Sequence, residues 1–149
     1  MHKTGDVIRI DSSDSKGSPS SFNPSPDTGR WIFTLGQGVP SYQMQVVDRE
    51  QRIVYRSGSS FATPIAAAIA AIILGVVDHA DVSKYEGLAT LRPRLRTRLG
   101  MEKVLCETCV QNAGSKRLEY YYLTPWSFFE DSEQTQIHVI LRTLRHVPP

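Results

Sequence analysis

A serine in a short turn ahead of an apolar segment is the residue of this chain best placed to do chemistry. Residues 58–64 read Gly-Ser-Ser-Phe-Ala-Thr-Pro, and an uncharged run rich in Ala and Ile follows from Ile65 to Val77. The pattern predicts that Ser60 lies where the turn becomes a helix, with Pro64 in the first helical turn, where its missing N–H costs nothing. Unpaired N–H groups and the helix dipole at that point could stabilise an oxyanion, so Ser60 is a candidate nucleophile.

The same letters also have an interpretation without chemistry. Serine is a favoured N-cap residue, so the Gly-Ser-Ser turn could simply begin a core helix. That interpretation does not explain the spacing of Ala62 and Pro64, nor the flanking sequence.

Residues 58–64 resemble the nucleophile motif of the subtilisin-like serine proteases (subtilases), G-[ST]-S-x-[AS]-x-P, with Ser59 where Thr is commoner. The apolar run after the motif resembles the buried central helix of that family. The resemblance implies that Ser60 is the catalytic nucleophile, that its backbone N–H is one oxyanion donor, and that Gly58 and Ser59 contact the substrate. It also implies a peptide or protein substrate and neither a metal nor a cofactor.

The resemblance covers roughly residues 7–77, which correspond to the C-terminal part of a subtilase catalytic domain. A segment at residues 7–10 and a loop containing Ser21-Phe22 are similar to the strand and loop that precede the last core strand of the family. Residues 36–40 resemble a Pro-Gly-Val turn, with Gln37 in place of the proline. The tail after this part resembles, more loosely, that of some fungal intracellular family members.

The family's catalytic base, its orienting carboxylate and the oxyanion Asn are missing from the matched part. A serine hydroxyl needs such a base and a group that orients it. The triad histidine of the family is followed by Gly, and this is true of none of the four histidines, His2, His79, His138 and His146. Asp27-Thr28-Gly29 has the letters of the family's Asp motif, and of an aspartic protease, but it follows Ser25-Pro26 instead of an apolar strand. We therefore expect a β-turn there.

Composition limits the other classes of function. The chain has 149 residues, 40% of them hydrophobic and 21% charged, which predicts one globular unit with a real core. A net charge of +2 does not indicate a nucleic-acid partner.

Cys106 and Cys109 form one C-x-x-C without the further ligands of a zinc site, so we expect two buried thiols. No signal peptide is visible and the apolar run is short for a membrane span, which predicts an intracellular, cytoplasmic protein without a membrane partner.

Hydrophobic patterns predict the remaining elements. We expect strands at 6–11 and 31–35, a hairpin formed by 43–47 and 51–55, and a helix over 100–110. A final helix begins near Asp131-Ser132 and carries one apolar face, formed by Ile137, Ile140, Leu141 and Leu144. The arginines of residues 92–98 are either a solvated basic face or a docking site for an acidic partner. The aromatic residues of 118–129 are expected to pack in a core.

The sequence therefore predicts an α/β fold: a partial subtilase three-layer sandwich with a buried central helix over about 60–77, followed by a helical and aromatic extension. Residues 1–80 form the protease portion and residues 81–149 the extension that packs on it. The leading hypothesis for function is a serine endopeptidase acting through Ser60, incomplete in this chain and completed by the missing N-terminal half of the domain. The alternatives are a non-catalytic protease fragment that acts as a folding or interaction partner and, less favoured, a small membrane-anchored protein.

Overall fold

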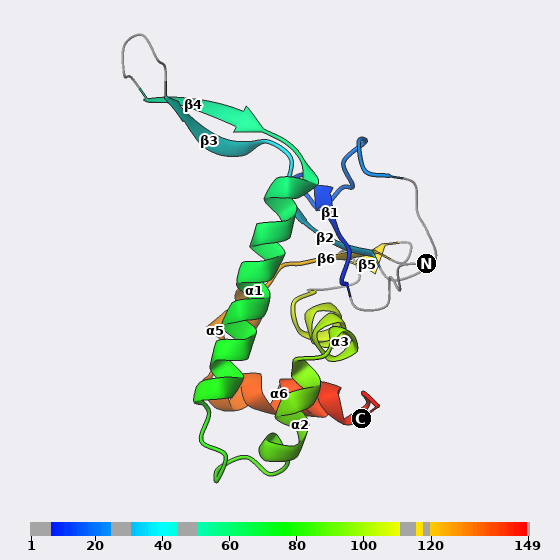
Figure 1. Ribbon diagram of the computed structural model, residues 1–149, viewed down its shortest axis with the longest axis vertical. Coiled ribbons are helices and arrows are strands. Elements are labelled where there is room, and N and C mark those ends of the chain that lie inside the picture. Colours follow the sequence, from blue (N-terminus) through cyan, green and yellow to red (C-terminus); the bar gives the residue numbers. More distant parts are fainter. Residues whose placement is uncertain (1–6, 25–30, 45–50, 111–115, 118–119, 149) are drawn as a thin grey trace.

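The computed structural model describes residues 7–24, 31–44, 51–110, 116–117 and 120–148 (Figure 1). The chain combines helices with a mixed β-sheet and a separate hairpin, so the α/β class is correct. The strands are β1 Ile10–Ser13, β2 Trp31–Leu35, β3 Val39–Met44, β4 Gln51–Arg56, β5 Lys116–Arg117 and β6 Tyr120–Tyr122. The helices are α1 Ser59–His79, α2 Leu88–Leu95, α3 Arg98–Thr108, α5 Trp126–Glu130 and α6 Glu133–Arg145.

The four-stranded sheet has the order β1-β2-β6-β5, with β1 and β6 parallel to β2 on either side of it. The predicted strand 31–35 is confirmed as β2. The first strand begins later than expected, at Ile10 in place of Asp6, and runs through Asp11 to Ser13. The prediction ended that strand at Asp11 because Asp and Ser usually mark turns, whereas here the serines continue the strand and are buried.

Strand β6 was not predicted. Its three tyrosines were expected to be part of a packing cluster, and they do pack: the ring of Tyr120 lies edge-on to Phe33, with 5.2 Å between the centroids. Their backbone also pairs with β2, in the register Ile32 to Tyr121. The extension therefore joins the sheet of the first part of the chain.

The hairpin of β3 and β4 is confirmed, but β3 begins at Val39, before the predicted start at Gln43. Pro40 lies within this strand, which is possible because each strand of a two-stranded sheet has a free edge. The turn predicted at 48–50 lies outside the described residues. Figure 1 shows the hairpin projecting from the N-terminal end of α1, away from the other elements.

Helix α1 is buried along one face only, which corrects the expectation of a helix buried on all sides. Ala62, Ala66, Ile69, Ile73 and Val77 are its buried residues, and they recur at the three- and four-residue spacing of a single helical face. The helix is long and apolar enough to cross a membrane, with a mean hydropathy of 2.2. Only 28% of its apolar 18-residue window is buried in this structure. The reason is architectural: in the described chain, α1 packs on β1 and β2 and, at its other end, on α2 and α6, and no second layer covers its outer face.

The C-terminal helices form the compact end of the molecule, around the C-terminal half of α1 (Figure 1). Helix α6 matches the predicted final helix, with the Ser132 hydroxyl accepting a hydrogen bond from the Thr135 N–H at 3.3 Å. Helix α3 begins at Arg98, earlier than expected, because Thr97 caps it by accepting from the Gly100 N–H. One hydrophobic cluster joins β2, α1, α2, α3 and α6, so the two predicted portions of the chain share a core.

Three of the four arginines between residues 92 and 98 have partners within the chain. Arg96 forms an ion pair of 2.6 Å with Asp78, Arg98 one of 2.7 Å with Glu102, and Arg94 donates to the Val147 carbonyl oxygen. The bonds of Arg96 and Arg94 tie α2 to α1 and to the residues after α6, and the Arg98–Glu102 pair lies within α3. The structure thus gives most of this basic run an internal role.

Candidate functional site

Ser60 is the second residue of α1 and is exposed to solvent. The N-cap of the helix is Gly58, and no side chain caps it, so neither serine is the capping residue, while the interpretation that this turn only begins a helix stays open. Among the described residues, neither the Ser60 hydroxyl nor its backbone N–H has a hydrogen-bond partner. The Phe61 N–H is occupied, since it donates to the Gly58 carbonyl at 3.0 Å. The Ser60 hydroxyl and N–H, both without a partner among the described residues, thus lie at the positive end of a helix dipole.

Pro64 lies one turn later than predicted. Because the helix already begins at Ser59, Pro64 falls in the second turn, inside the helix. Its ring nitrogen carries no hydrogen, so the Ser60 carbonyl cannot receive the i+4 bond that it would receive in an uninterrupted helix. Both backbone polar groups of Ser60 are consequently outside the regular helical hydrogen bonding.

Two glycines allow the turn before Ser60 to lie against the end of β2. The Gly58 N–H donates to the Gly36 carbonyl at 2.8 Å. A Cβ on Gly36 would lie 2.5 Å from the Ser12 hydroxyl oxygen and 2.9 Å from the Gly58 carbonyl oxygen, so no side chain fits there. A Cβ on Gly58 would lie 3.1 Å from the Ser60 hydroxyl oxygen, at a φ of 156° that side chains rarely adopt. The role of Gly58 seen here is to bring Ser60 close to the sheet; the predicted substrate contact of Gly58 and of the exposed Ser59 stays a prediction.

This contact places Ser60 at the carboxyl ends of the parallel strands β1 and β2. Loops at the carboxyl ends of parallel strands, next to a helix N-terminus, are the usual place for ligand and catalytic sites in α/β proteins. The location follows from the chain path, since β2 leads through Gly36 into the hairpin, and the hairpin returns to the start of α1.

A network of polar side chains, in which Ser12 and Ser20 are buried, holds the loops around this point. The hydroxyl groups of Ser12 and Ser20 lie 2.9 Å apart, and Ser20 donates to the Gln37 side-chain oxygen at 2.9 Å. The Asn23 amide pairs with both backbone groups of Ser12, accepting at 3.1 Å and donating at 2.7 Å. The Asn23 side chain therefore satisfies the backbone N–H and carbonyl of Ser12, which a neighbouring strand would otherwise pair at the edge of β1.

Sequence reasoning missed this network. Gln37 was noted only as a departure from the proline of the family, whereas the structure shows that its side chain joins the loop after β1 to the turn after β2. Ser57 adds another link, because its hydroxyl accepts from the Gly38 N–H at 3.0 Å. The clustering of Ser and Asn in residues 12–23 was the available signal, but it indicated only a loop.

No described histidine lies near Ser60. His79 is at the opposite end of the same helix, about 28 Å away at the α-helical rise per residue. A ring nitrogen of His79 is hydrogen-bonded to the Gly75 carbonyl oxygen. His138 and His146 lie on and at the end of α6, which packs near that same far end of α1. His2 lies outside the described residues.

The described carboxylates near the sheet have other partners. Asp11 is buried and forms an ion pair of 2.9 Å with Arg9. Asp14 accepts hydrogen bonds from the backbone N–H groups of Lys16 and Ser18, which fixes the turn after β1. The turn predicted at Asp27 lies outside the described residues. Among the residues that the structure describes, no group of three His, Cys, Asp or Glu side chains could hold a metal ion.

Both cysteines are buried and unpaired with one another. Burial raises the pKa of the Cys109 thiol, partly offset by its contact with the Thr108 hydroxyl. The thiol is therefore held in its protonated, unreactive form, which agrees with the expectation of two structural thiols in place of a redox pair.

In comparisons with known proteins, no family model, no curated protein and no solved structure matches this chain.

Proposed function

We propose that this chain carries the nucleophile-bearing part of a subtilisin-like serine endopeptidase and that Ser60 forms the acyl-enzyme with a peptide or protein substrate. The observation that supports this function is the placement of Ser60. Its exposed hydroxyl lies beside its own unpaired N–H at the start of a 21-residue helix, above the carboxyl ends of two parallel strands. In the reaction, Ser60 Oγ attacks the scissile carbonyl carbon, the Ser60 N–H stabilises the oxyanion, and the amine leaves as the ester forms.

The proton of the Ser60 hydroxyl must go to a base, and in the described residues no histidine is within reach of it. We therefore propose that a segment corresponding to the N-terminal half of the protease domain, from a longer form of this chain or from another polypeptide, supplies the histidine, its orienting Asp and a further oxyanion donor. The uncovered face of α1 supports this proposal, because the helix is apolar there and only 28% of its apolar 18-residue window is buried. The buried thiols Cys106 and Cys109 support an intracellular location, as disulfides are rare in reducing compartments.

Chemical rescue tests this function directly. The folded chain is incubated with a fluorophosphonate in the presence of increasing imidazole, which replaces the missing base, and modified serines are identified by peptide mass spectrometry. General-base catalysis contributes about 10²–10⁴-fold in enzymes, so we expect imidazole to raise the modification of Ser60 at least tenfold over that of Ser57 and Ser59. The Ser59→Ala variant should retain the effect and Ser60→Ala should lose it. Equal modification of the three serines would overturn the proposal.

A non-catalytic role is the second candidate, and the hairpin favours it. Tyr42 and Ile53 face one another across its two strands, Tyr55 follows on the same face, and the three are exposed by 75%, 55% and 75%. An exposed apolar face of this kind marks interaction sites in soluble proteins. If the fragment acts only through such a surface, imidazole will not favour Ser60, and Ser60→Ala will leave partner binding unchanged.

A further inference from the structure

The hairpin has a strand edge that no described strand uses. Strands β3 and β4 form a two-stranded sheet, so each of them pairs with a described strand on one side only. Strand β3 contains Pro40, which has no N–H to donate. Strand β4 contains no proline, so its outer edge offers an uninterrupted row of backbone donors and acceptors. Figure 1 shows the hairpin standing clear of the other elements, which leaves room for a further strand.

One face of the hairpin is apolar and has no described cover. Pro40, Tyr42, Ile53 and Tyr55 share this face, because Pro40 pairs with Tyr55 and Tyr42 pairs with Ile53. The last three of these side chains are exposed. A two-stranded hairpin alone is marginally stable at best in water, and a third strand beside an apolar face is the usual way to stabilise one. The apolar face therefore indicates that β4 pairs with a further strand.

The opposite face of the hairpin is basic. Arg52 and Arg56 lie on this face of β4, on either side of Val54, and both are exposed. Among the described residues, no carboxylate pairs with either arginine. A matching strand would be apolar on one face and would bring a carboxylate to an arginine on the other. A second copy of β4 has this combination, since Glu50 directly precedes the strand in the sequence.

Charge decides between the registers in which two copies of β4 can pair antiparallel around a two-fold axis. With Arg52 on the axis, the two copies of this arginine lie opposite each other. With Val54 on the axis, Arg52 of each copy lies opposite Arg56 of the other. Like charges directly opposite one another destabilise a sheet. An axis nearer either end of β4 leaves only a short overlap, so Ile53 is the favoured residue on the axis.

We propose that two copies of this chain pair through β4 in antiparallel register, with Ile53 on the two-fold axis, and so form a four-stranded sheet. In this register Ile53 lies opposite its own counterpart, and Arg52 lies opposite Val54 of the other copy. One residue before the start of β4, Glu50 comes opposite Arg56 of the other copy, and the symmetry makes this attractive pair twice. The contact is separate from the serine site and does not depend on the proposed protease function.

The test is sedimentation equilibrium of the full-length chain from about 10 to 500 µM, since one short strand per copy is a small interface and predicts a weak dimer. Ile53→Lys puts two like charges opposite each other on the axis and should leave the chain monomeric. Ile72→Lys, on the outer face of α1, is the matched control, because Ile72 is 51% exposed and Ile53 is 55% exposed. It should leave the dimer intact.

Two outcomes of this experiment would overturn the proposal. One is a chain that stays monomeric over the whole concentration range, which would leave the hairpin to a different partner. The other is a dimer that Ile72→Lys abolishes and Ile53→Lys does not, which would place the contact on α1. Far-UV circular dichroism confirms that both variants are folded.

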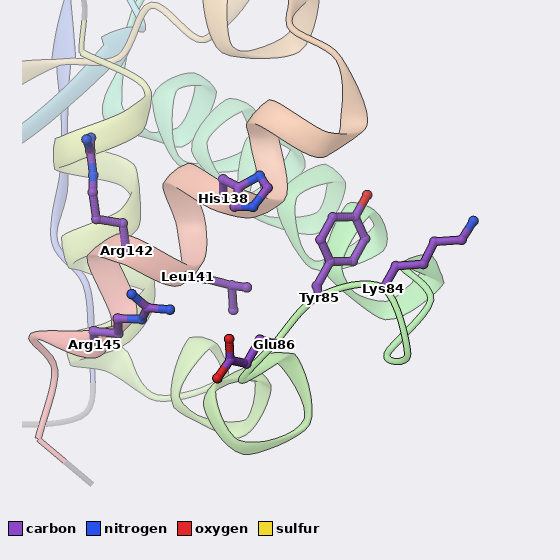
Figure 2. A pocket seen from close by; sticks show the side chains of 7 residues that line it. All are labelled: Lys84, Tyr85, Glu86, His138, Leu141, Arg142 and Arg145. Atoms are coloured by element: carbon purple, nitrogen blue, oxygen red, sulfur yellow. The ribbon is translucent and has the colours of Figure 1, made fainter.

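Exchanging the charges tests the register. Arg56→Glu and Glu50→Arg each turn the attractive pair into a repulsive one, twice per dimer, and each should raise the dissociation constant at least about tenfold. The double variant should return it to within about threefold of the parent chain. Arg142→Glu makes the same change of charge on α6, where Figure 2 shows the Arg142 side chain directed away from Glu86, and should have no effect. A folded double variant that does not recover the dimer would show that the register is wrong.

Discussion

The two ends of α1 have very different surroundings. At the C-terminal end, the helix packs against α2 and α6 in a core that contains several fully buried aliphatic side chains. At the N-terminal end, the hairpin projects with exposed Tyr42 and Tyr55, and Ser60 has no described partner (Figure 1). The C-terminal end lies in a packed core, whereas the N-terminal end exposes apolar side chains and polar groups without described partners.

The largest effect should come from the buried face of α1. Ile73 is 0% exposed and its neighbour Ile72 is 51% exposed, so the pair differs mainly in burial. Ile73→Ala should lower the free energy of unfolding by about 2–5 kcal/mol, as expected for a cavity in an aliphatic core. Ile72→Ala should change it by no more than about 0.5 kcal/mol. Urea denaturation of both variants measures this; similar losses at the two positions would mean that both faces of the helix are covered.

The contact between the end of β2 and the turn before Ser60 gives the next prediction. Gly36→Ala places a methyl group against the Ser12 hydroxyl and the Gly58 carbonyl and should lower the free energy of unfolding by about 1–3 kcal/mol. Gly75→Ala is the matched control, because no atom lies within 4 Å of the point where its Cβ would be, and it should stabilise the helix by about 0.5–1 kcal/mol. Thermal unfolding of the two variants shows whether the first loses stability and the second gains it. A neutral Gly36→Ala would show that the two backbones do not approach closely.

The smallest effect concerns how the free energy of unfolding changes with pH in alkaline solution. The pKa of Cys109 is raised in the folded state, so above about pH 8.5 the unfolded chain loses this proton first and unfolding becomes more favourable. The stability of the native chain should therefore fall with rising pH more steeply than that of Cys109→Ala, by at most about 1.4 kcal/mol per pH unit. Denaturation at pH 7, 9 and 10 gives the slopes. Parallel slopes would contradict the buried state of this thiol.

Local patterns predicted the elements whose sequence signals agree with one another. The strand at Trp31–Leu35, the hairpin and the final helix with its Ser132 cap were all predicted in type and approximate position. The start of α1 at Ser59 was also close to the prediction, because a turn followed by an apolar helix is a strong signal.

Features that depend on distant parts of the chain could not be predicted in the same way. Pairing of β6 with β2 joins residues that are far apart in sequence, and three consecutive tyrosines carry no alternation that would identify a strand. The outer face of α1 is as apolar as a buried face, so composition predicted burial where the described chain supplies no covering layer. The Ser20–Gln37 bond depends on how two loops meet, which no local pattern encodes.

The central proposal is that Ser60 is a nucleophile whose base is not among the described residues of this chain. Its most direct test is labelling of the folded chain with a fluorophosphonate probe, without imidazole, beside Ser60→Ala. A serine reacts with this probe quickly only when a base and an oxyanion site activate it. The account predicts no labelling above that of Ser60→Ala. Labelling that disappears in Ser60→Ala would contradict it and would show that the chain supplies its own base.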